Sequence, residues 1–197
     1  MIESFAWIVD HDGFLTLLTA AIGGFVALAH YRSDKAWQKK QFAFDFVERM
    51  FDDDRTMAAL RMLDWDNGEF TAEMIAEFKL DSAEGHWGAA EVVHALRDHD
   101  GKHAGMGLFT RKEYAIRELF DACLNHFDRL GHFLRTGIIA ADDVPGAITY
   151  YPLLGREARG QDRNAALLAY MRRYRYTDAG HFFAEVEKHN PEPAARP

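Results

Sequence analysis

The pattern of apolar and polar positions changes abruptly near the start of this chain of 197 residues. From Gly13 to Ala29 the sequence GFLTLLTAAIGGFVALA contains no charged residue. A helix from Phe14 to Tyr31 rises about 1.5 Å per residue and spans roughly 27 Å, close to the thickness of a hydrocarbon layer. The run therefore predicts a single transmembrane helix. Small residues that let two such helices pack recur every four positions: Thr16, Ala20 and Gly24 in one row, and Thr19, Gly23 and Ala27 in the next.

The charges beside this run predict its orientation. The nearby Lys and Arg residues all follow it, at Arg32, Lys35, Lys39 and Lys40. The positive-inside rule then places the N-terminus outside and the rest of the chain in the cytoplasm, at the inner membrane. Two alternatives compete with a membrane anchor. A buried helix of a soluble protein would carry the costly pair Gly23-Gly24, and a signal peptide cleaved after Ala29 would lack a basic start.

After this run, apolar residues recur at helical spacing and no segment alternates as a strand does. The clearest helix is predicted from Thr110 to Thr136, because Thr110 and Glu113 form a capping box and Gly137 suits a left-handed end. Its apolar face should be buried at Leu119, Phe120, Phe127 and Leu130. Further helices are predicted over 33–51, 54–63, 71–78, 88–97, 161–175 and 177–189, with another helix start at 142–145.

These elements predict an all-α protein: a transmembrane helix followed by a cytoplasmic domain resembling a helical bundle. We expect an anchor over 1–36, a helical domain over 37–189 and a flexible proline-rich tail over 190–197. The formal net charge of −8 disfavours general binding of nucleic acid. A single cysteine, Cys123, excludes a framework of internal disulfides.

Two segments resemble a known kind of family. The sequences LNHFDRLGHFLRTGIIAADDV and MFDDDRTMAALRMLDWD are similar to those of an uncharacterised bacterial family of unknown function. Its members are small helical proteins with one N-terminal membrane helix. The resemblance covers about a third of the chain and consists of helix-packing patterns. It therefore supports the architecture and implies no activity.

The loop predicted over 98–107 contains the candidates for a metal site. His99 and His103 lie four residues apart beside Asp98 and Asp100, and imidazoles with carboxylates suit a divalent transition metal. The same residues also fit a solvated polar loop. The sequence E-x-x-H ending at His94 matches half of a di-iron helix motif, but no second half is present. We therefore predict no metal site and no cofactor, with His99 and His103 as weak candidates.

Catalytic patterns in the sequence are no more frequent than chance predicts. Helical ribonucleases of the HEPN type carry Arg followed by His at a short interval, and Arg97 with His103 and Arg175 with His181 fit that loose spacing. Cys123 is followed by His126 and can be read as a nucleophile with its base, or as a buried structural thiol. No catalytic residue is predicted.

The sequence favours a membrane-anchored interaction or sensor protein without enzymatic activity. Its expected partners are the membrane, a protein and another copy of itself in a homo-oligomer, with no nucleic acid. One alternative is a nuclease-like enzyme that depends on Arg and His. Another is an oligomeric membrane effector whose helical domain senses a partner.

Overall fold

A computed structural model shows a helical chain that forms two compact units. The structure describes residues 3–82, 84–97, 109–154 and 161–190, and in the first helix side chains are described at position 16 and from position 18 onward. One unit contains residues 1–41 and the other residues 42–197. Helix α1 (Glu3–Phe51) crosses this boundary. The sequence-based division had instead placed the end of the first segment at residue 36.

The first unit consists of helix α1 up to Gln41. The predicted continuation of the apolar helix through 33–51 is confirmed, because α1 has no break before Phe51. Every described side chain from Thr16 to Gln41 is exposed. The exposed set includes Thr16, Thr19, Ala20, Gly23, Gly24 and Ala27. Apart from the backbone of the helix itself, nothing lies within 4 Å of a Cβ built on either glycine. Their predicted role in helix packing stays a prediction.

The prediction of a transmembrane anchor is wrong. In the part of the chain whose side chains are described, no helix is long and apolar enough to cross a membrane. The described apolar positions extend only from Thr16 to Ala29 before His30 and Arg32 follow, whereas a span needs about 20 apolar residues. Counting uncharged positions overstated the apolarity, since Thr, Gly and Ala add little transfer free energy. The predicted inner-membrane location fails with the anchor.

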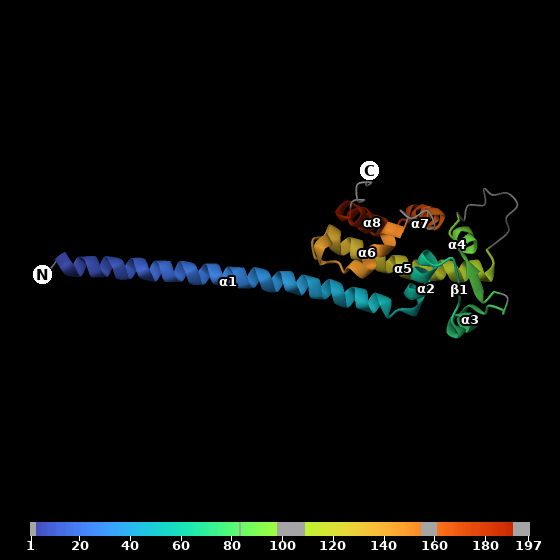
Figure 1. The fold of residues 1–197 in the computed structure, drawn as a ribbon, viewed down its shortest axis with the longest axis horizontal. Helices are drawn as coiled ribbons and strands as arrows, with labels where there is room; N and C mark the ends of the chain where they lie inside the picture. The colour runs from blue at the N-terminus through green and yellow to red at the C-terminus, as the bar shows by residue number, and fades with distance from the viewer. Residues whose placement is uncertain (1–2, 83, 98–108, 155–160, 191–197) are drawn as a thin grey trace, which may run out of the picture. The chain divides into compact units, whose positions relative to one another are not determined.

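The second unit is built around α5 (Arg111–Arg135), which Figure 1 shows running among the other helices. Its capping box is confirmed, since the Thr110 amide donates to Glu113 over 2.7 Å and the Glu113 amide donates to the Thr110 hydroxyl over 3.2 Å. Gly137 has a φ of 73°, as predicted. The predicted buried face is also confirmed at Leu119, Phe120, Phe127 and Leu130.

Helix α8 (Thr177–His189) packs along α5 at very short range. A Cβ added to Gly131 would lie 1.7 Å from the Asp178 carbonyl oxygen, so only glycine permits this approach. Asp128 of α5 caps α8 by accepting the Asp178 and Ala179 amides over 3.0 Å each. Arg135 adds an ion pair to Asp178 over 2.8 Å. These contacts fix the angle and register of the two helices.

The remaining elements cover α5 from other sides. Helix α2 (Asp54–Asp64) and α4 (Ala89–Ala95) contact α5, as does the short α3 (Ala72–Phe78). The chain then continues through η1 (Ala141–Asp143), α6 (Gly146–Leu153) and α7 (Gln161–Tyr174) to α8. The all-α class is therefore confirmed, with helix bounds within a few residues of those predicted.

One short two-stranded sheet was not predicted. Strands β1 (Asn67–Glu69) and β2 (His86–Gly88) pair antiparallel, with Gly68 opposite Trp87. The sequence Asn67-Gly68 had been interpreted as a turn. Three-residue strands are too short to show an alternating pattern, so the sequence carried no usable signal for them.

Candidate functional site

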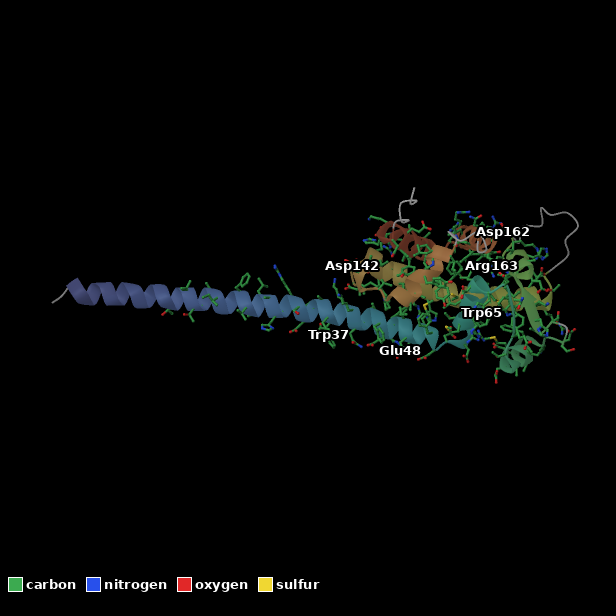
Figure 2. The ribbon with its side chains drawn as sticks, in the orientation of Figure 1. Trp37, Glu48, Trp65, Asp142, Asp162 and Arg163 are labelled. Atoms are coloured by element: carbon green, nitrogen blue, oxygen red, sulfur yellow. The ribbon has the colours of Figure 1, made fainter. Side chains whose placement is uncertain are left out.

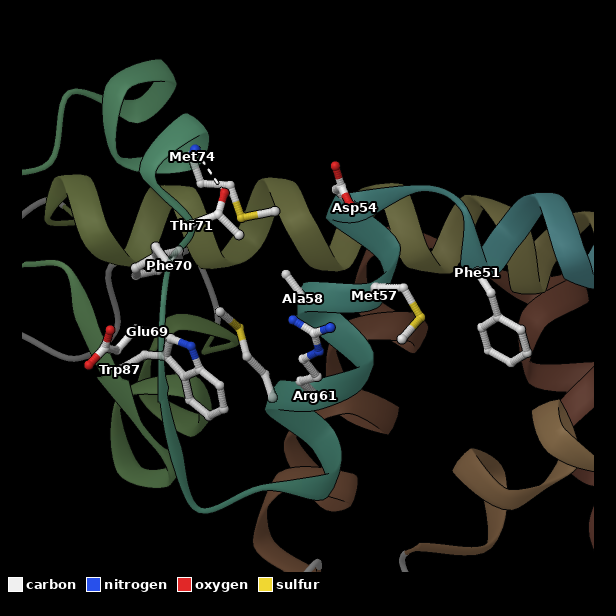
Figure 3. A pocket seen from close by; sticks show the side chains of 11 residues that line it. Phe51, Asp54, Met57, Ala58, Arg61, Glu69, Phe70, Thr71, Met74 and Trp87 are labelled. Carbon is white, nitrogen blue, oxygen red and sulfur yellow. Dashed lines mark hydrogen bonds between the residues drawn. The ribbon is translucent and has the colours of Figure 1, made fainter.

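A pocket in the second unit lies between α2, the β1–β2 sheet and the start of α3 (Figure 3). Its volume is about 200 Å³. An apolar cavity of about 150 Å³ is already large enough to take up benzene, so one large side chain fits here. Most of the lining is apolar or thioether, with charged groups added from α2 and β1: Phe51, Asp54, Met57, Ala58, Arg61, Met62, Glu69, Phe70, Thr71, Met74 and Trp87.

Helix α2 forms one wall of the pocket, because one of its faces packs in the core and another stays partly exposed. The Asp53 carboxylate begins the helix by accepting the Thr56 amide over 3.3 Å. Leu60 and Leu63 turn to the core, whereas Met57 and Ala58 are half-buried and line the pocket. The helix thus contributes to the core and leaves a second, partly apolar face open.

Trp87 forms the opposite wall, where Figure 3 shows its indole across from the side chains of α2. Its exposed fraction is only 4%. The indole lies against Gly68 of the partner strand, where an added Cβ would stand 2.4 Å from a ring atom. Gly68 therefore permits this position of the indole, and a side chain at residue 68 would displace it.

The start of α3 closes the third side. The Thr71 hydroxyl accepts the Met74 amide over 3.3 Å, the bond drawn in Figure 3. This cap sets the first turn of the helix and places Met74 in the pocket lining beside Phe70. Met57, Met62 and Met74 together supply unbranched, polarizable side chains that adapt to irregular apolar shapes.

Arg61 is the one positive charge among the described residues that line the pocket. Its side chain is exposed, and its guanidinium lies 5.8 Å from the centre of the Trp65 ring. Among the described residues it forms no ion pair with a carboxylate. Asp54 and Glu69 also line the pocket, and Glu69 lies 3.4 Å from His86. The pocket surface is thus mixed: apolar and thioether side chains lie beside two carboxylates and a guanidinium that can donate to an incoming acceptor.

A second cleft, of about 550 Å³, lies beside Glu113 at the start of α5. The Glu113 carboxylate accepts from Arg97 over 2.5 Å and also contacts His94. Burial by itself raises the pKa of Glu113, but the bonds from Arg97, the Thr110 amide and His94 outweigh it and lower the pKa to about 2. Glu113 and His94 in the lining of this cleft are therefore already paired within the chain.

The weak metal candidates cannot be placed. His99 and His103 lie outside the described residues, as does the rest of the loop 98–107. Within the described residues, no group of three or more His, Cys, Asp or Glu is arranged to hold a metal ion. The two residues of the half motif, Glu91 and His94, contact different side chains. Glu91 pairs with Lys112 over 2.7 Å, and His94 contacts Glu113.

The two Arg–His pairs, Arg97 with His103 and Arg175 with His181, differ in how much of each pair the structure describes. His103 lies outside the described residues, and its partner Arg97 is bound to Glu113. His181 lines a cleft with Arg135, Glu185, Lys188 and His189, and Arg175 is not among the described residues that line it. Neither of the two Arg–His pairs considered for the nuclease alternative is seen as an assembled site in the described part of the chain.

Cys123 is a structural thiol. It is 1% exposed, and burial, with Asp53 adding to it, raises the pKa of the thiol far above its ordinary value. A thiolate, which is the nucleophilic form, would not be populated near neutral pH. His126 lies 3.5 Å from Asp53 and packs on Phe46, and its burial lowers its pKa.

Arg117 and its aromatic neighbours form a buried polar cluster that the sequence did not reveal. Arg117 donates to the Ala95 carbonyl over 3.0 Å and to the Tyr174 hydroxyl over 2.6 Å, which joins the end of α4 to α7. Tyr170 and Tyr176 both donate to Asp121, over 2.7 and 2.9 Å. These tyrosines therefore serve the packing of the helices.

The residues that make the pocket were missed from sequence for a definite reason. Met57, Arg61, Met74 and Trp87 come from three separate elements, and each sits in an ordinary local pattern. The one available signal was the sequence His86-Trp87-Gly88, a large aromatic residue next to glycine between two predicted helices.

Comparisons with known proteins add no relative: no protein-family model, no curated protein and no solved structure matches this chain. The resemblance to a bacterial family of unknown function therefore stays a prediction.

Proposed function

We propose that this chain is a helical protein-interaction module without enzymatic activity. In this proposal, the second unit captures one apolar side chain of a partner protein in the pocket between α2 and the β1–β2 sheet. A carboxylate next to that side chain in the partner pairs with Arg61.

The observation that carries the proposal is the combination of apolar and thioether side chains in the pocket lining with a guanidinium that forms no carboxylate pair among the described residues. Apolar interiors with few polar groups at the edge are typical of sites for an anchoring side chain. Three methionines permit the lining to fit side chains of different shape. Arg61 then selects acidic neighbours through a charge-assisted hydrogen bond.

The test uses random peptides displayed on phage and selected on the full chain. We expect enriched peptides to share a large apolar residue with Asp or Glu one or two positions away. Two variants examine the two parts of the site. Arg61→Glu removes the cation, and Ala58→Phe fills the space; each should weaken binding of a selected peptide about tenfold or more.

Matched controls make the same chemical changes elsewhere. Arg172→Glu on α7 and Ala184→Phe on α8 alter exposed residues that do not line the pocket, and both should bind as the parent chain does. Circular dichroism would establish that all four variants are folded. Peptides without an acidic residue, or equal losses in the controls, would contradict the proposal.

A further inference from the structure

The described side chains of the first unit expose apolar surface without contacts that bury it. Between Thr16 and Gln41 all of them are exposed, including Phe25 at 75% and Trp37 at 64%. Figure 2 shows Trp37 standing out from the helix. Ile22, Val26 and Leu28 are exposed as well. Exposed apolar residues gathered on one segment often mark an interface.

The charges along this helix are divided between its two ends. Residues 1–31 contain Glu3, Asp10 and Asp12 and no Lys or Arg. Residues 32–40 contain Arg32, Lys35, Lys39 and Lys40, with Asp34 as the single acid. The two sets are also nearly symmetric in the sequence: Asp12 with Arg32, Asp10 with Lys35 and Glu3 with Lys40 are each centred within one residue of Ile22.

From these two features we infer that the first unit pairs with the same helix of a second copy, in antiparallel orientation and crossing near Ile22. Antiparallel pairing brings the acidic end of each helix beside the basic end of the other. A parallel pair would set the basic residues 32–40 of both helices side by side, and like charges in contact oppose association. The helix dipoles also favour the antiparallel arrangement.

The middle of the helix suits such a crossing. Gly23 and Gly24 have no side chains, and nothing lies within 4 Å of the position that a Cβ would take. The spacing between two packed helices depends on the side chains at their contact, so glycine permits a close approach there. Ile22, Phe25 and Val26 on the same turns would then become buried between the copies.

Spin labels on the full chain distinguish the two orientations. Cys123 is buried, so a label attaches selectively to an introduced cysteine. With Ala21→Cys, near the centre but outside the glycine pair, both orientations give a short distance of about 10 Å. With Ser33→Cys, an antiparallel pair places the labels about 35 Å apart, whereas a parallel pair again gives about 10 Å.

Charge reversal provides a second and independent measurement. Lys35→Glu, Lys39→Glu and Lys40→Glu together should raise the dissociation constant of the pair at least about tenfold in sedimentation, less so at high salt. Adding Asp10→Lys and Asp12→Lys to the same chain should restore the pairing. A parallel pair would show no such rescue, because reversal at both ends leaves like charges beside each other.

Three results would overturn the inference. One is a chain that stays monomeric at all concentrations, and the second is a short distance from the label at residue 33. The third is a monomer that instead binds phosphatidylcholine vesicles through the same residues. Pairing as described, with a distance of about 35 Å and charge rescue, would establish it.

Discussion

Helices α1 and α5 are the two long helices of the described chain, and they use apolar residues in opposite ways. In α5 the apolar residues recur at three- and four-residue steps, and Leu119, Phe120 and Phe127 are fully buried. In α1 the apolar residues between Thr16 and Ala29 run around the whole helix, and their described side chains are all exposed. A periodic apolar face is thus buried by neighbouring helices of its own unit, whereas the described apolar residues on all sides of α1 stay exposed within the first unit.

The same contrast holds for the glycines of the two helices. Gly131 of α5 lies so close to the Asp178 backbone that a methyl group has no room. Gly23 and Gly24 of α1 have open space where a side chain would be. Glycine in α5 is required by an existing contact, and glycine in α1 is tolerated without one.

The largest expected effect comes from truncating the buried face of α5. Phe127 contacts Phe182 and Phe183 of α8 with ring centres 5.5 and 5.1 Å apart. Phe127→Ala should lower the free energy of unfolding of the second unit by about 3–5 kcal/mol, because a cavity remains. The matched change Phe25→Ala in α1 should leave it within about 0.5 kcal/mol. Urea titration measures the free energy of unfolding of both variants. Equal decreases in the two variants would contradict the difference between the two helices.

The second prediction concerns glycine. Gly131→Ala should force α8 away from α5 and lower the free energy of unfolding by about 1–3 kcal/mol, since the Asp128 cap and the Arg135 ion pair depend on this approach. Gly23→Ala should instead raise the helix content of α1 slightly, because alanine favours a helix by about 1 kcal/mol. Thermal unfolding followed by circular dichroism compares the two. A stabilising Gly131→Ala would mean that the helices pack less closely than described.

The third prediction is a dependence of stability on pH. The pKa of Glu113 is lowered from 4.5 to about 2 in the folded chain, so the ionised form stabilises the fold. This contribution is fully present above about pH 5 and is lost as the pH falls from there towards 2, because the unfolded chain binds the proton first. Glu113→Gln should lose about 1–3 kcal/mol at neutral pH. The difference in the free energy of unfolding between Glu113→Gln and the parent chain should become smaller in acid. A difference that stays constant with pH would contradict this prediction.

Periodicity and caps in the sequence were sufficient for most helices of the second unit. Thr110, Glu113 and Gly137 marked the ends of α5, and the four predicted core residues are buried, because a cap and an apolar face are local properties of a few residues. The same local reasoning failed at Gly13–Ala29. There it counted uncharged positions without the length and apolarity that a membrane span requires.

The sequence by itself determined the helical class and the division between a periodic and a non-periodic long helix. Only the tertiary structure decided that Trp87, Met74 and Arg61 line one pocket, and that Asp128 caps a helix fifty residues later. The physical reason is the range of the interactions. Caps and helical faces depend on residues three or four apart, whereas a pocket depends on how separate helices and strands pack together.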